Sequence, residues 1–514
     1  MRIAEGGKAS LADGKGIPDR AMLFVFGAAI CLGASLVFLV QPMVAKMILP
    51  ILGGSPAVWN TSMVFFQAAL LAGYAYAHFS IRAFGLKRQP KIHLVVLVLP
   101  VIALPLALPA WAEDVNGPPA LWVLALLAVA VGGPFFVAAT ASPLLQRWFS
   151  ATGHPDAHDP YFLYAASNVG SLLALVGYPL VIEPNLSIPA QTWLWSGGYV
   201  VFALLVAGCM LVLRRRGMYG FDSEEADTPE SSDSNPSASE PYVPLFWRTR
   251  LWWVFLAFMP SSLMLGVTTY LTTDVAPVPL LWVVPLGLYL LSFIFVFSRR
   301  VVLSSLSVRA ARWALPALAV GLALLFFDVV YMPLWMVFAL HLATLFAAAM
   351  VAHVRLASER PPPSRLTEFF LLVSVGGVLG GIFNALVAPQ IFDSLLEYPI
   401  VVVLLLLVMP AIRRPHLPGK LRWAEEAVLA AALFGLVAYM LPSQLWTGWT
   451  LATISLLAAS LAAAYLSPRR LPRRRVPPLL APGAPRALGR GDVGVRVYEH
   501  RGVFAQRANL LRGV

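Results

Sequence analysis

The sequence predicts an all-α polytopic membrane protein with about fourteen transmembrane helices, arranged as two six-helix halves and a C-terminal helix pair. The first observation is composition: 59% of the 514 residues are hydrophobic and 12% are charged. A soluble chain averages about 25% charged residues, so this one lacks the polar side chains that a water-exposed surface requires. The other two observations are a series of long apolar runs and the distribution of the basic residues between them.

The apolar runs are long enough to cross a bilayer core, which takes about 20 residues of helix. They lie at 21–46, 58–80, 92–109, 120–142, 161–182 and 192–213, then at 251–270, 279–298, 311–327, 333–354, 368–388 and 398–412, and finally at 424–440 and 448–466.

Polar stretches separate the runs into larger regions. The predicted organisation is a disordered N-terminal tail (1–20), a first six-helix half (21–213), an acidic, Ser-rich linker (214–250), a second six-helix half (251–412), an extra helix pair (413–466) and a disordered Arg/Pro-rich tail (467–514). Acidic, Ser-rich stretches with few apolar residues are typical of flexible linkers.

The basic residues indicate the orientation. Cytoplasmic loops of membrane proteins are rich in Lys and Arg. With the N-terminus inside, every predicted inner segment is basic, and of the 37 Lys and Arg only Lys46 falls outside these segments. The predicted outer loops contain only acidic charges, among them Glu183 and Asp274. The pattern supports an even helix count with both termini inside, and it attributes the net charge of +12 to membrane orientation rather than to nucleic acid.

An internal repeat accompanies the six-plus-six count. "LYAASNVGSLLALV" (163–176) aligns with "FLLVSVGGVLGGIF" (370–383), so that Ser167 matches Ser374 and Gly170 matches Gly377. Two parallel six-helix halves are the architecture of major-facilitator-type transporters. The overlapping Gly-x-x-x-Gly pairs in "GGVLGG" indicate close helix packing.

Polar side chains within the apolar runs are the candidate binding residues, because polar groups are costly inside a bilayer and often mark function. Stripes on helices 2, 5 and 11 predict a shared polar cavity, and hydrogen bonding between helices is the alternative explanation. The candidate substrate-binding residues are Gln41, Lys46, Asn60, Gln67, Tyr164, Asn168, Asp274, His341 and Asn384.

Catalytic and metal-binding patterns are missing from the sequence. His341 and His353 have no Cys or carboxylate at metal-ligand spacing, so we expect no metal site and a packed, hydrogen-bonded role for His341. No recognisable catalytic motif occurs, so no cofactor is expected. Cys31 and Cys209 lie in apolar runs and suggest no disulfide framework.

Three stretches carry a resemblance to a known family. They read "FLVQPMVAKMILPILGGSPAVWNTSMVFFQAALLAGYAYAH", "SPLLQRWFSATGHPDAHDPYFLYAASNVGSLLALVGYPLVIEPNL" and "HVRLASERPPPSRLTEFFLLVSVGGVLGGIFNALVAPQIFDSLLEYP". Over about residues 20–466 the chain resembles the membrane half of the bacterial fused major-facilitator/spermidine-synthase-like proteins. The resemblance implies a bacterial inner-membrane location and a Rossmann-type aminopropyltransferase domain after the helices.

That domain has no room in this sequence. Only 48 residues follow the last predicted helix, whereas a Rossmann domain needs several units of about 30 residues each. The Arg-rich tail resembles out-of-frame translation, which predicts a truncated or frameshifted member, or one whose synthase half is a separate chain. Aminopropyl transfer is therefore not assigned to this chain.

Because the sequence has no room for the synthase domain, an enzymatic function is disfavoured, and two other classes of function remain. The leading hypothesis is a transporter-like binding module in the bilayer for a polyamine or related metabolite. The alternative is a non-transporting anchor or scaffold for a synthase-like partner. Lys46 bears on the first hypothesis, because it lies near the outer end of the first helix. Either it snorkels to the surface, or it pairs with Asp274, failing that with Glu183, and closes the outer mouth of a cavity.

Overall fold

The computed structural model describes residues 18–52, 56–113, 119–216, 246–275, 281–298, 301–393, 395–408, 419–440 and 458. The chain divides into a unit of residues 1–466 and a unit of residues 467–514, and the second unit lies outside the described residues. The predicted final helix at 448–466 lies outside them as well, apart from Ala458.

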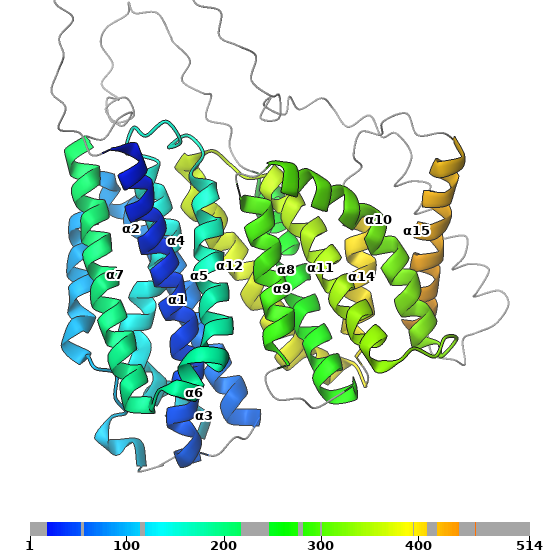
Figure 1. Ribbon diagram of the computed structural model, residues 1–514, viewed down its shortest axis with the longest axis horizontal. Helices are drawn as coiled ribbons and strands as arrows, with labels where there is room; N and C mark the ends of the chain where they lie inside the picture. Colours follow the sequence, from blue (N-terminus) through cyan, green and yellow to red (C-terminus); the bar gives the residue numbers. More distant parts are fainter. Residues whose placement is uncertain are drawn as a thin grey trace, which may run out of the picture. The chain divides into compact units, whose positions relative to one another are not determined.

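Every regular element in the described residues is helical (Figure 1). The first half contains α1 (Asp19–Leu52), α2 (Pro56–Val98), α3 (Pro119–Leu127), α4 (Gly133–Phe149), α5 (Leu163–Gly177), α6 (Glu183–Asn185) and α7 (Ile188–Arg216). The second contains α8 (Trp247–Thr269), α9 (Val283–Phe297), α10 (Val301–Phe326), α11 (Leu334–Ser358), α12 (Leu366–Ile382), α13 (Ala388–Ile391) and α14 (Glu397–Val408), followed by α15 (Gly419–Met440).

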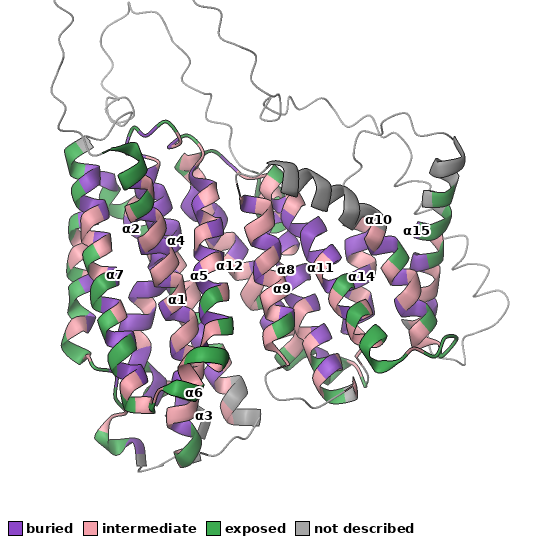
Figure 2. Ribbon diagram, viewed as in Figure 1, coloured by how far each residue is buried: buried purple, intermediate pink, exposed green. Residues whose placement is uncertain are grey.

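Eight helical stretches in the described part of the chain are long and apolar enough to cross a membrane, and four shorter apolar helices accompany them. The prediction of an all-α, multi-pass membrane fold is confirmed. Large apolar side chains are exposed, for example Trp193 and Leu204 on α7. Figure 2 shows exposed positions along α7. In a bilayer these side chains face lipid rather than water.

Two helix boundaries differ from the sequence prediction. Helix 3 was expected at 92–109. In the structure its residues form the last part of α2 and a short helical segment that ends at Ala103. The prolines at 105 and 109 stop the helix there. The turn between helices 2 and 3 lies at Gly85, whose φ of 63° suits glycine better than other residues. Helix 1 continues to Leu52, so Lys46 lies inside α1 rather than at its end.

Because successive spans alternate in direction, the bundle has two ends. We call the end at which α1 ends and α2 begins the distal end, and the opposite end the proximal end. The antiparallel packing of α7 on α1 fixes this geometry: Gly198 of α7 lies against Leu36, and Gly208 lies against Val25. The distal end is the side that the basic residues predict to be outside.

The two halves repeat one packing scheme. Helix α1 packs on α4, α5 and α7, and α8 packs on α11, α12 and α14 in the same way. Between the halves, α5 packs on α9 and α2 packs on α12. This matched packing of α1 and α8 agrees with the prediction of two repeated halves.

One hydrogen bond occurs in both halves. The Ser35 hydroxyl donates to the carbonyl of Gly170 over 2.9 Å, and the Ser261 hydroxyl donates to the carbonyl of Gly377 over 2.9 Å. Gly170 and Gly377 are the pair that the sequence repeat aligned. The repeat therefore corresponds to equivalent positions on α5 and α12.

Candidate functional site

A cavity of about 880 Å³ lies between the two halves. Its walls come from α1, α2, α4 and α5 of the first half and from α8, α9 and α12 of the second, with residues of the π-helical segments and of the loop before α9. Along α1 the lining starts at Ala34, near the middle of the helix, and ends at Ile48 near the distal end. The cavity therefore extends from the middle of the bundle toward its distal end.

The walls are mainly apolar and aromatic, with isolated polar groups. Tyr164 of α5 forms part of the floor, where its ring lies 5.2 Å from that of Phe293 and 4.7 Å from that of Phe370. Hydroxyl and amide groups from both halves also line the cavity: Gln67, Asn168, Ser171, Ser261, Thr272 and Ser374. The Ser374 hydroxyl is buried and has no hydrogen-bond partner among the described residues.

Among the described residues of the lining, Lys46 and Glu183 are the only charged ones. The Lys46 ammonium and a Glu183 carboxylate oxygen form an ion pair between α1 and the distal part of the fifth span. Their side chains remain 40% and 29% exposed, respectively. The cavity thus carries one positive and one negative group in contact, and its described walls have no net charge.

A π-helical segment (Tyr178–Ile182) directs Glu183 toward the cavity. Leu175, Tyr178 and Glu183 all line the same wall. Along an unbroken α-helix, Glu183 would be rotated about 80° around the axis from Leu175, because eight residues exceed two turns of 3.6. The wider i→i+5 turns remove most of that rotation. Sequence periodicity alone therefore misplaces this carboxylate.

The structure brings five of the nine predicted site residues to the cavity: Gln41, Lys46, Gln67, Tyr164 and Asn168. The side chains of Asn60 and Asp274 lie outside the described residues. The predicted Lys46–Asp274 pair therefore falls outside the described residues. The second choice, Lys46–Glu183, is present.

His341 and Asn384 are not among the lining residues. His341 is fully buried within the second half, where its Nδ1 lies 2.9 Å from the Tyr398 hydroxyl and its ring 4.3 Å from that of Tyr270. Asn384 donates to the Ser262 hydroxyl over 2.7 Å. Both side chains join helices of the same half, and their polarity in the sequence reflects that packing.

Sequence reasoning left several lining residues out of the candidate set. Tyr74 of α2, Ser142 of α4 and Tyr289 of α9 line the cavity, as does Glu183. Tyr74 belongs to the polar stripe of helix 2 and could have been predicted from it. Ser142 and Tyr289 lie outside the polar stripes of helices 2, 5 and 11.

At the proximal end, side chains join the two halves directly. Arg360 Nη2 lies 2.7 Å from Asp159 Oδ2, and its guanidinium lies 5.2 Å from the centre of the Tyr161 ring. The Tyr161 hydroxyl donates to the carbonyl of Pro361 over 2.8 Å. We call Asp159, Tyr161, Arg360 and Pro361 the inter-half latch. It joins the halves at the end of the bundle opposite to the Lys46–Glu183 pair.

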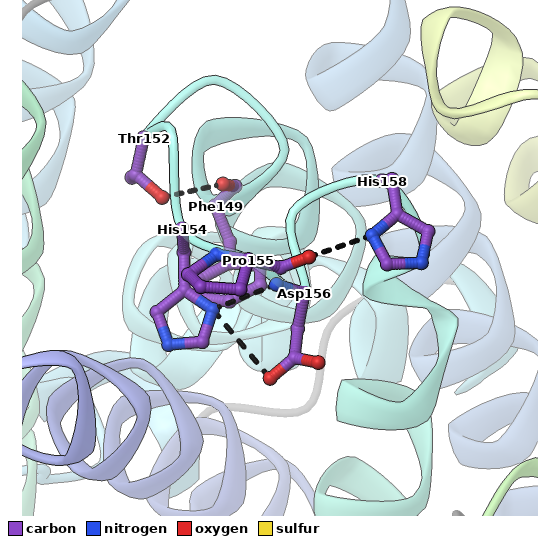
Figure 3. A network of polar contacts seen from close by, with 6 residues as sticks. All are labelled: Phe149, Thr152, His154, Pro155, Asp156 and His158. Carbon is purple, nitrogen blue, oxygen red and sulfur yellow. Dashed lines mark hydrogen bonds and ion pairs between the residues drawn. The ribbon is translucent and has the colours of Figure 1, made fainter. Parts of the chain in front are cut away.

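Local hydrogen bonds join residues of the loop between α4 and α5, just before Asp159 (Figure 3). His154 Nδ1 accepts the Asp156 amide over 2.9 Å and lies 3.5 Å from the Asp156 carboxylate. His158 Nδ1 and the Pro155 carbonyl lie 2.7 Å apart. In the described part of the chain no group of three or more His, Cys, Asp or Glu side chains is placed to hold a metal ion.

No protein-family model matches the sequence, and no curated protein matches it. Several solved structures resemble the fold, among them the following three. The proton:xylose symporter XylE of the major facilitator superfamily, bound to 6-bromo-6-deoxy-D-glucose, has 12% identity and a TM-score of 0.45, covering 87% of this chain and 97% of that one.

The other two are a bacterial homologue of the human lysosomal transporter Spinster, in inward-facing occupied and unoccupied conformations. Their identities are 17% and 15%, each with a TM-score of 0.40, covering 88% and 87% of this chain and 97% of each of theirs. At these scores the similarities bear on neither ligand nor mechanism, and the assignment of the fold rests on the helix packing itself.

Proposed function

We propose that this protein is a transporter-like membrane protein that binds a small solute in the cavity between its halves and exposes it to the two ends of the bundle in turn. The observation that supports this most is the asymmetry of the cavity. It extends toward the distal end, whereas the inter-half latch joins the halves at the proximal end. A site between two parallel six-helix halves, closed on one side, is what rocking of one half against the other requires.

The charges in the cavity wall limit the net charge that a ligand can carry. The resemblance to the spermidine-synthase-like family suggested a polyamine, which carries several positive charges. A polycation needs several anionic partners in a poorly hydrated site. The described lining offers one carboxylate, Glu183, and Lys46 already neutralises it. A solute without net charge fits these walls better, and spermidine is a useful negative control.

Membership of the fused major-facilitator/spermidine-synthase-like family, in a bacterial inner membrane, is part of the same proposal and rests on the three sequence stretches quoted above. The scaffold alternative, in which the helices only anchor a synthase-like partner, makes a different prediction. A scaffold does not need a bundle with two populated states.

Distances between spin labels test the proposal. Proximal labels at His158 and Ser358 are exposed and lie on opposite halves, as do distal labels at Asn185 and Ile391. Cys31 and Cys209 are replaced by alanine so that only the introduced cysteines react. We expect two distances at each end, with the long proximal distance occurring together with the short distal one. A single distance at both ends would favour the scaffold.

Orientation requires a separate measurement. The basic inner segments predict that the distal end faces outward. A cysteine at Asn185 is expected to react with a membrane-impermeant maleimide in intact cells, and a cysteine at Ser232 in the linker is expected to react only after lysis. Reaction of Ser232→Cys in intact cells would reverse the assignment.

A further inference from the structure

The Lys46–Glu183 pair is more than an orientation anomaly, because both members line the cavity. Each keeps part of its side chain exposed, 40% for Lys46 and 29% for Glu183, so a guest can reach both without displacing a helix. The remaining polar groups of the described lining are uncharged hydroxyls and amides, and the rest is apolar or aromatic.

We infer that the ligand is a zwitterionic amphiphile: a molecule with a carboxylate and an ammonium group close together and an apolar body. The carboxylate binds Lys46, the ammonium binds Glu183, and the apolar body extends toward the aromatic floor at Tyr164 and Phe293. This inference rests on the proposed function of the cavity as a solute-binding site, and it names the class of solute.

The energetic reason is charge balance. Separating Lys46 from Glu183 leaves two partly exposed charges without a partner in a mainly apolar cavity, which is unfavourable. A zwitterion offers each of them a new partner of opposite sign, and charge-assisted hydrogen bonds replace the one that is lost. A cation can satisfy only Glu183 and leaves Lys46 without a partner, and an anion does the reverse. A neutral solute leaves the pair closed and gains no charged contact.

The geometry of the two helices suits this exchange. Lys46 comes from α1, whereas Glu183 follows the π-helical segment at the end of the fifth span, so the two charges are on separate elements. Below them the cavity has room for a substantial side chain, since its volume is about 880 Å³. Apolar walls with a few convergent polar groups are the usual form of a small-molecule site.

A matched set of phenylalanine derivatives tests the inference on the full-length protein in nanodiscs. L-Phenylalanine is the zwitterion, its methyl ester the cation, its N-acetyl derivative the anion and phenethyl alcohol the neutral analogue. Binding is measured by titration calorimetry, with spermidine as the polycation. We expect the wild type to bind L-phenylalanine at least about tenfold more tightly than any of the others, the scale expected for loss of one charged contact.

The variants must then change the preference in opposite directions. Lys46→Met leaves Glu183 alone and is expected to favour the methyl ester, whereas Glu183→Gln leaves Lys46 alone and is expected to favour the N-acetyl derivative. The exchanged pair, Lys46→Glu with Glu183→Lys, retains both charges and is expected to bind the zwitterion again. It also serves if either single variant does not fold. Arg250→Gln is the control, because it removes a comparable ion pair, with Glu368, outside the cavity lining.

Reciprocal preferences of the two single variants support the inference. The same preference in all variants, or no binding by any member of the series, overturns it. The spin-label distances separate this result from the proposed function: two states at each end without selective binding of the zwitterion would remove the ligand class and leave the transporter-like mechanism standing.

Discussion

Helices α5 and α12 occupy equivalent places in the two halves, yet they present different chemistry to the cavity. In each helix a glycine carbonyl, that of Gly170 or of Gly377, accepts a hydrogen bond from a serine hydroxyl of a neighbouring helix. Each continues into a π-helical segment near its distal end, Tyr178–Ile182 or Phe383–Val387. The residue after the first segment is Glu183, and the residue after the second is Ala388.

The partner helices differ in the same way. When the halves are aligned so that Ser35 matches Ser261, Lys46 matches Thr272. Both Lys46 and Thr272 line the cavity. Only the first half therefore carries charge at this depth of the described lining. The repeat therefore preserves the backbone packing, while the charged groups of the described lining lie in one half. Four predictions test this division.

The largest effect is expected at the aligned glycines. A Cβ added at Gly170 would lie 2.1 Å from the Cys31 carbonyl oxygen, whereas a Cβ at Gly377 meets nothing within 4 Å. Gly170→Ala is therefore expected to destabilise the protein by about 3 kcal/mol or more, because overpacking against backbone cannot be relieved by side-chain rotation. Gly377→Ala is expected to be near neutral in thermal unfolding monitored in detergent.

The control lies one residue away from Gly377. A Cβ at Gly376 would lie 2.3 Å from the Val254 carbonyl oxygen, so Gly376→Ala should behave like Gly170→Ala. Equal stability of the Gly170→Ala and Gly377→Ala variants would show that the two helix contacts are not as different as the structure indicates.

The second effect concerns the charged pair in the first half. Lys46→Met and Glu183→Gln are each expected to lower stability, and the double change should cost less than their sum. For partly exposed charges the coupling is about 1 kcal/mol at most. A cycle of Lys46→Met with Asp274→Asn tests the other carboxylate that the sequence suggested. Coupling to Asp274 that exceeds coupling to Glu183 would contradict the pairing described here.

The inter-half latch gives the third effect. Arg360→Gln removes the ion pair with Asp159 and the cation–π contact with Tyr161, which together join the halves at the proximal end. We expect the long proximal distance between labels at His158 and Ser358 to become about five times more populated, as loss of roughly 1 kcal/mol predicts. Arg355→Gln is the control, because its ion pair with Glu359 lies within one half.

Much of the fold could be predicted from the sequence because bilayer solvation imposes a simple rule: each span must be apolar and about 20 residues long. The aligned Gly170 and Gly377 indicated the repeat, whereas the orientation that the charge alternation predicts remains a prediction. Helix ends were less predictable, since local features such as the prolines after Ala103 and the turn at Gly85 determine them.

The cavity was partly predictable for a physical reason as well. Gln67 and Asn168 were found because an α-helical stripe brings polar residues to one face. Glu183 was only a second choice as partner of Lys46, because the π-helical segment that directs it inward leaves no periodic signal. His341 has the same polarity in the sequence as a binding residue, but its partner, Tyr398, is distant in sequence and became visible only in the folded chain.

The smallest effect is expected at Thr272, the counterpart of Lys46 in the second half. Its hydroxyl already donates to the Thr268 carbonyl over 2.8 Å within its own helical stretch. We therefore expect it to contribute little to the contact between the halves or to the binding of a charged ligand. Thr272→Val keeps the shape of the side chain and removes that local hydrogen bond. We expect a change in unfolding free energy of no more than about 0.6 kcal/mol, the average for a polar contact in a membrane protein, and an unchanged order of affinities in the phenylalanine series. If Thr272→Val altered the preference between the cationic and anionic derivatives as strongly as Lys46→Met, charge recognition would extend to both halves, and the division of roles between α5 and α12 would not hold.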